Sequence, residues 1–119
     1  MNVLNRFVLI GALVAWGCLA YGATVNGILV DRACGAKIAA SNDQKAAAGH
    51  TRECALMPPC VASGYGVLTA DGKYITLDDA GNQKAQTALK ASKKTDNMKV
   101  QVTGDQSGDS IKVASIKLL

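Results

Sequence analysis

The chain has 119 residues and a formal net charge of +4, so after removal of a leader it can hold only one small domain. Its lysines are spread from Lys37 to Lys117, and aromatic residues make up only 4% of the chain. Scattered positive charge and few stacking side chains argue against nucleic-acid binding.

The first 22 residues have the pattern of a secretory signal peptide. A short start with one positive charge, residues 1–6, precedes an apolar run over residues 7–20, which is shorter than the about 20 residues that a membrane-spanning helix needs. Ala20 and Gly22 are the small residues expected before a cleavage site that follows Gly22. We therefore expect an exported protein, periplasmic or secreted, with a mature domain over residues 23–119 and no transmembrane segment after cleavage.

Cys18 offers a second way to process the same leader. Ala15, Trp16, Gly17 and Cys18 loosely match the lipobox at which bacterial lipoproteins are cleaved and acylated on the cysteine. The bulky Trp16 fits that motif poorly. Cleavage after Gly22 is therefore favoured over lipidation of Cys18.

The mature chain begins with a predicted strand and a helical insertion. Residues 24–31 are rich in β-branched and apolar side chains around Gly27, which predicts a strand with a bulge or bend at the glycine. Residues 35–48 are rich in alanine, lysine and glutamine and predict a helix. A short helix is expected over residues 51–57, and the two prolines that follow should stop it.

The rest of the mature chain predicts two strand pairs with a helix between them. The predicted segments are strands at residues 67–70 and 73–77, a helix at residues 83–92, and strands at residues 98–103 and 110–118. Asp71-Gly72 is a strong turn signal between the first two strands. Asp78 or Asp79 is well placed to cap the helix.

This order of elements predicts a mainly β fold with helices, a small OB-fold-like five-stranded barrel. The cysteine-containing insertion would lie between strands 1 and 2, and the second helix between strands 3 and 4. A closed barrel lets a small chain bury its Val, Ile and Leu side chains and leaves no open sheet edge. A crosslink would add to a stability that is otherwise marginal at this size.

Cys34, Cys54 and Cys60 fall in the insertion together with His50, the only histidine of the chain. In an oxidising compartment a disulfide is the expected state, and three cysteines leave one thiol over. A bridge from Cys34 to either Cys54 or Cys60 would close the insertion against the end of the first strand, and would stabilise the fold by roughly 3 kcal/mol. Both pairings stay open at this point.

The same four residues also make a candidate soft-metal site. His50 and Cys54 are four residues apart and would share a helix face, and Cys34 and Cys60 would complete a ligand set for zinc or cuprous copper. The insertion has no paired Cys-x-x-Cys motif, and export favours oxidation of the thiols. A structural disulfide is therefore preferred over a metal.

An enzymatic hypothesis would make the spare thiol a nucleophile activated by His50. The sequence offers no convincing third residue to orient the histidine, and Asp31 is interpreted as the polar end of a strand. No catalytic residue is therefore assigned, and a non-enzymatic protein is expected.

Several segments of the mature chain carry a resemblance to known proteins. They are Gly27-Ile-Leu-Val-Asp31, Cys34, the run from His50 to Cys60, Gly64, Asp71-Gly72-Lys73, and the ending from Val102 to Ile116. Together they resemble a family of small exported bacterial proteins to which no reaction is assigned. The resemblance implies export, a small β-barrel and a cysteine-bearing insertion.

The sequence thus predicts a non-enzymatic, disulfide-stabilised exported protein. It would bind a ligand or a protein through the insertion and the adjoining barrel face, by analogy with other OB-folds. The alternative is a periplasmic zinc or copper protein that uses Cys34, His50, Cys54 and Cys60.

Overall fold

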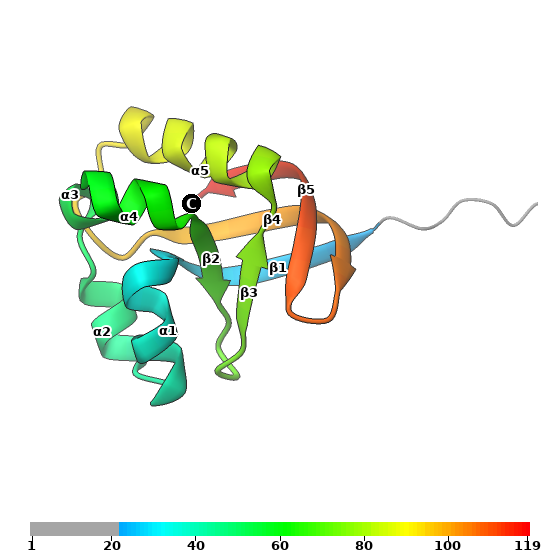
Figure 1. Ribbon diagram of the computed structural model, residues 1–119, viewed down its shortest axis with the longest axis horizontal. Coiled ribbons are helices and arrows are strands. Elements are labelled where there is room, and N and C mark those ends of the chain that lie inside the picture. Colours follow the sequence, from blue (N-terminus) through cyan, green and yellow to red (C-terminus); the bar gives the residue numbers. More distant parts are fainter. Residues whose placement is uncertain (1–21) are drawn as a thin grey trace, which may run out of the picture.

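The computed structural model describes residues 22–119, which form a small mixed α/β domain with a five-stranded sheet and five helices (Figure 1). In chain order the elements are β1 (Ala23–Asp31), α1 (Arg32–Ala40), α2 (Gln44–Gly49), α3 (Arg52–Ala55), α4 (Pro58–Ser63), β2 (Tyr65–Leu68), β3 (Tyr74–Leu77), α5 (Asp79–Ala91), β4 (Lys99–Ser107) and β5 (Ser110–Leu118). The predicted combination of five strands with helices is confirmed.

Two of the sequence-based predictions fall on the N-terminus. The predicted signal peptide, except for Gly22, and the lipidation candidate Cys18 lie outside the described residues. Within residues 22–119, no helix is both long enough and apolar enough to cross a membrane.

The strands are hydrogen-bonded in the order β1-β2-β3-β5-β4, and β1 also pairs with β4, so the sheet closes on itself. All neighbours are antiparallel except β3 and β5, which run parallel. β1 takes part in two pairings, because Ala23–Ile28 lies along β4 and Ile28–Asp31 lies along β2. Asp31 at the end of β1 is therefore opposite Tyr65 at the start of β2.

The core is apolar and follows the period of two that strands impose. Val100 and Val102 on β4 are fully buried, whereas Gln101 between them is exposed. Ile111 and Val113 on β5 belong to the same buried cluster, as the alternation of these strands predicts. Burial of each such side chain stabilises the fold by about 1.5–3 kcal/mol.

The irregularity of the sheet lies in the pairing of β4 with β5 rather than in β1. The β1–β4 register runs without a shift through Gly27, so, of the bulge or bend predicted at that glycine, the bulge is wrong. Glycine is needed there because a Cβ atom would lie 2.2 Å from the carbonyl oxygen of Leu68. The register shift falls between Thr103, opposite Ser115, and Gly104, opposite Val113, so the extra residue is on β5; β4 continues to Ser107, beyond its predicted end.

α5 covers part of the sheet and packs mainly along β5 (Figure 1). Asp78 caps its first turn, as the sequence predicts, and accepts hydrogen bonds from the backbone N–H groups of Gly81 and Val113. Ala85 and Leu89, on the face of α5 that packs against the sheet, are fully buried. The Asp78 side chain thus fixes both the start of the helix and its position against β5.

Four short helices, α1 to α4, fill the stretch between β1 and β2. The single helix expected over residues 35–48 is divided into α1 and α2, because Asn42 has a positive φ of 48° and Asp43 caps a new helix. The short helix expected over residues 51–57 is present as α3, which is shorter than predicted and is capped by Thr51. The two prolines not only end that turn but also begin α4, where the first helical positions need no N–H donor.

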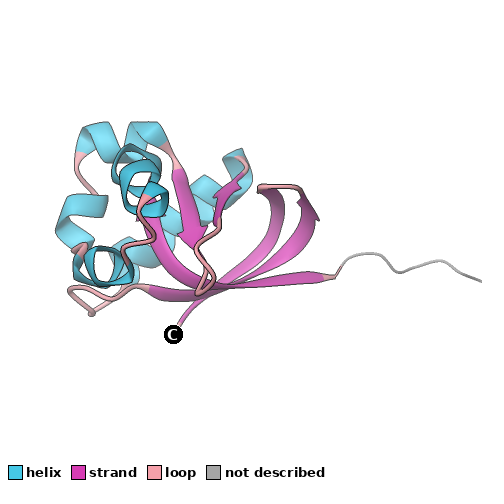
Figure 2. Cartoon of the chain, turned by 90° about the horizontal axis from the view of Figure 1, so that it is seen from below, coloured by secondary structure: helices cyan, strands magenta, loops and turns pink. Residues whose placement is uncertain are grey.

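The helices gather around one end of the sheet, and the β4–β5 hairpin and the start of β1 extend away from them (Figure 2). Within the insertion, α1 packs on both α4 and the start of β2. The helices of the insertion, rather than the sheet itself, therefore enclose the end of β1.

Candidate functional site

Asp31 is the centre of the candidate site. It is the last residue of β1 and the N-cap of α1, and its side chain is fully buried. One carboxylate oxygen, Oδ2, accepts a hydrogen bond of 3.1 Å from the backbone N–H of Cys34. The other, Oδ1, lies 2.6 Å from Nε2 of His50. A carboxylate without solvent is stable only when such partners surround it.

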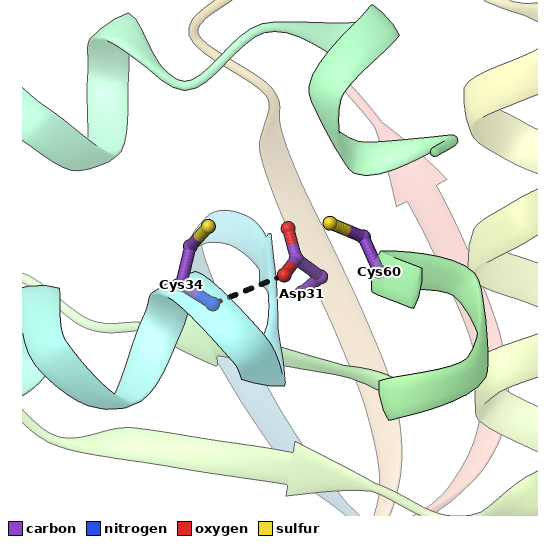
Figure 3. A group of neighbouring side chains, drawn as sticks. All are labelled: Asp31, Cys34 and Cys60. Carbon is purple, nitrogen blue, oxygen red and sulfur yellow. Dashed lines mark hydrogen bonds between the residues drawn. The ribbon is translucent and has the colours of Figure 1, made fainter. Parts of the chain in front are cut away.

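Two thiols flank this carboxylate. Cys34 lies in the first turn of α1, Cys60 lies in α4, and their sulfur atoms are on either side of the Asp31 side chain (Figure 3). The two sulfurs and a carboxylate oxygen all lie within 4.8 Å of one another. Three potential metal ligands thus meet at one point, two from the start of α1 and one from α4.

Backbone contacts hold the two thiol-bearing helices together. The backbone N–H of Arg32 donates to the carbonyl of Gly64 over 2.8 Å, and that of Ala33 donates to Oγ of Ser63 over 3.2 Å. These bonds join the first turn of α1 to the end of α4. The approach of Cys34 to Cys60 is consequently fixed by the backbone.

His50 reaches the site by a route that the sequence did not predict. α2 ends at Gly49 and α3 begins only at Arg52, so the expectation that His50 and Cys54 share one helix face is wrong. His50 instead caps the end of α2, and its side chain, only 9% exposed, pairs with Asp31. It lies outside the three-ligand group, as a partner of the carboxylate.

Cys54 lies in a different environment from the other two cysteines. Its backbone N–H is held by Oγ1 of Thr51, and its side chain is exposed. It does not belong to the group formed by Asp31, Cys34 and Cys60. Over residues 22–119 all three cysteines are free thiols, so neither predicted pairing, Cys34 with Cys54 or with Cys60, is present as a bond.

The environment keeps the two central thiols protonated. Burial, followed by the negative charge of Asp31, raises the pKa of Cys60 to about 11. The same two causes raise the pKa of Cys34. A thiol must lose its proton to act as a nucleophile, and these shifts oppose that loss near neutral pH. The pair is therefore poorly suited to covalent catalysis without a cation to replace the protons.

Tyr65 ties the site to the apolar core. It is buried beside the end of β1, and its hydroxyl donates to the carbonyl of Ala55 over 2.7 Å. Burial and the nearby Asp31 charge raise the pKa of this hydroxyl to about 12. The bond fixes α3 above β2 and helps to close the site.

Three hollows of the described surface lie away from this site. One runs beside Gly27 and Lys99, a second lies between α5 and β5, and a third is next to Arg52. None of these three is lined by Asp31, Cys34 or Cys60.

Sequence reasoning identified Cys34, His50 and Cys60 but missed Asp31. Interpretation of this residue as the polar end of a strand was incomplete, because its side chain points into the group of thiols. One local signal was present: an aspartate that ends an apolar strand and precedes a cysteine by three residues. That spacing is the one at which an N-cap carboxylate meets the first turn of a helix.

No family model, no curated protein and no solved structure matches this chain.

Proposed function

We propose that this chain is an exported, non-enzymatic protein that binds a zinc ion through Asp31, Cys34 and Cys60. The observation that carries the proposal is the meeting of two sulfurs and one carboxylate oxygen within 4.8 Å. The proposal narrows the expected ligand of the insertion to a metal ion. Of the four ligands expected from the sequence it keeps Cys34 and Cys60, leaves out His50 and Cys54, and adds Asp31.

The donor types favour zinc over cuprous copper. Thiolates bind both metals, but a carboxylate is a hard ligand that suits zinc and not copper in its cuprous state. The exposed Cys54 would be needed to give copper a third sulfur, and it lies outside the group. Zinc therefore matches the residues that the fold brings together.

His50 supports the site from outside the ligand set. Its Nε2 lies 2.6 Å from Oδ1 of Asp31, where it orients the carboxylate and limits its rotation. Pairs of histidine and carboxylate of this kind are common around metals, and loss of the outer partner weakens metal affinity by about 10–100-fold. His50→Ala should accordingly weaken zinc binding without abolishing it.

A bound cation also accounts for the burial of charge. Asp31 is 0% exposed, and burial, followed by the negative charge of Asp31, raises the pKa of both thiols beside it. A divalent ion would replace the two thiol protons, which leaves the net charge of the site unchanged, and it would coordinate the carboxylate in the same space. The site thereby exchanges two S–H bonds for coordination bonds.

The fold and the compartment belong to the same proposal. We take the closed sheet, with β3 parallel to β5 and α5 between β3 and β4, as an OB-fold-like barrel that carries the metal site on its first insertion. Export is supported by the pattern of residues 1–22. Mass spectrometry of the protein recovered from the periplasm should find a mature chain that begins at Ala23, and a lipid on Cys18 would contradict this.

Zinc binding to the reduced mature protein tests the proposal. After equilibrium dialysis against zinc under a reductant, elemental analysis should find a single zinc ion per chain. Cys34→Ser, Cys60→Ser and Asp31→Asn should each lose the ion. The asparagine variant keeps an N-cap residue, so its folding is preserved.

Cys54→Ser is the matched control, since it removes a thiol of the same insertion that lies outside the ligand group. This variant should bind zinc as the unmodified protein does. Absence of zinc from the unmodified protein would overturn the proposal. Loss of zinc in Cys54→Ser, or a preference for cuprous copper over zinc, would overturn the assigned ligand set.

A further inference from the structure

The two thiols of the site have one more chemistry open to them, which is to bond to each other. Their sulfur atoms lie within 4.8 Å, on helices that already pack together. A disulfide requires a separation of about 2.05 Å. Rotation of the two side chains and a small shift of the helices would close the difference.

We propose that Cys34 and Cys60 form a reversible disulfide that excludes the metal ion, so that the site is loaded only when reduced. This inference rests on the proposed function. It assigns the odd thiol of the insertion to Cys54, which is exposed and lies outside the group. It also joins the two expectations from the sequence, a disulfide and a metal site, as two states of the same residues.

The two states exclude each other because a sulfur atom that is part of a disulfide is no longer a thiolate that can bind the metal ion. In the metal state, each sulfur is a thiolate that donates a pair to the cation. In the oxidised state, the sulfurs share a covalent bond and only Asp31 remains as a charged ligand. One carboxylate, assisted by His50, is too few donors to hold zinc in a structural site.

The oxidation balances with a disulfide as the partner. Cys34–SH and Cys60–SH give up two electrons and two protons and become Cys34–S–S–Cys60. The oxidant R–S–S–R accepts them and leaves as two R–SH molecules. An exported protein meets such oxidants, since disulfides persist in the compartments outside the cytosol.

The test oxidises the zinc-free Cys54→Ser protein with oxidised glutathione until the count of free thiols is constant. Peptide mapping should find a Cys34–Cys60 disulfide and no glutathione adduct. Zinc affinity of the oxidised protein should be lower by more than roughly a hundredfold. A reductant should restore it.

The unmodified chain supplies the second measurement, because there all three pairings compete. Its disulfide should again join Cys34 to Cys60, and zinc loaded beforehand should slow its formation. A bond from Cys54 to either of the other cysteines, or oxidised protein that binds zinc as tightly as reduced protein, would overturn the inference. Failure of the reduced protein to bind zinc would instead overturn the proposed function, and the mapped pairing would still be known.

Discussion

The closed sheet and the insertion between β1 and β2 are held together by different interactions. The sheet buries a continuous apolar cluster, in which Leu29, Val67 and Val100 are at most 1% exposed. The insertion is made of four short helices, none longer than nine residues. It adds caps and hydrogen bonds to a smaller apolar cluster, in which the buried Ala47 packs with Val30 and Leu68 of the sheet. Helices of this length are unstable alone.

The contrast shows where each part obtains its stability. The sheet is stabilised by the transfer of side chains out of water, which needs no ligand and no particular redox state. The helices of the insertion surround Asp31, whose buried charge is stabilised by contacts with the backbone N–H of Cys34 and with Nε2 of His50. A metal ion or a crosslink should therefore change the insertion strongly and the sheet little, and the predictions below separate the two parts.

The largest effect is expected in the sheet. Val100→Asp places an unpaired charge where the side chain is 0% exposed, and should destabilise the protein by more than about 4 kcal/mol, or prevent folding. Circular dichroism during urea unfolding measures this. Gln101→Asp, at the exposed neighbouring position, should change stability by no more than about 0.5 kcal/mol. Equal loss in both variants would contradict the assigned faces of β4.

An intermediate effect is expected at the junction of the two parts. Asp31→Ala removes the N-cap of α1 and leaves the buried His50 without its partner, so it should cost about 2 kcal/mol. Asp43→Ala removes the exposed cap of α2 and should cost about 1 kcal/mol. Urea unfolding compares the two, and a larger loss in Asp43→Ala would count against a central role for Asp31.

Alkaline pH should weaken the reduced, metal-free protein through Cys60. Folding raises the pKa of this thiol from 9.0 to about 11, so the folded state holds the proton more tightly than the unfolded state does. The resulting stability is fully present below pH 9 and is lost as the pH rises through 11. Tyr65 adds a similar loss at higher pH, because its pKa is raised to about 12.

The free energy of unfolding, measured in urea between pH 8 and pH 11, should therefore fall as pH rises. Cys60→Ala should show a shallower fall over the same interval, whereas Cys54→Ala should match the unmodified protein. If Cys60→Ala leaves the slope unchanged, the thiol is not buried beside Asp31 as described.

The smallest effect concerns the intrinsic stability of the insertion. Gly49 ends α2 without a positive φ, and a Cβ atom there would meet nothing within 4 Å. Gly49→Ala should therefore raise stability by about 0.5 kcal/mol, through a loss of freedom in the unfolded chain. Thermal unfolding would show this as a small rise in Tm. A fall in Tm would mean that α2 requires glycine at its end.

Local signals predicted most of the sheet and the caps. The alternation around Val100 and Val113, the Asp71-Gly72 turn and the cap at Asp78 all depend on neighbours in sequence. For that reason a single sequence was enough to place them. The length of β4 was underestimated because residues 104–107, which have the composition of a turn, extend by pairing with the distant strand β5.

The geometry of the site depends on distant contacts, which explains what the sequence missed. Asp31 is buried because β2 returns beside the end of β1 and α4 closes over it. His50 meets Asp31 because α2 stops two residues before α3 begins. Neither the burial of Asp31 nor its contact with His50 can be predicted from the periodicity of the sequence. Residue type and spacing therefore suggested Cys54 as a ligand, at a place where the fold brings in a carboxylate.

X-ray absorption spectroscopy of zinc bound to the reduced, full mature chain tests the central claim most directly, because it counts the sulfur atoms around the metal. The structure predicts two sulfurs at about 2.3 Å, with oxygen or nitrogen at about 2.0 Å in the remaining positions. A shell with three sulfurs, which would require Cys54, or a shell with none would contradict the site of Asp31, Cys34 and Cys60.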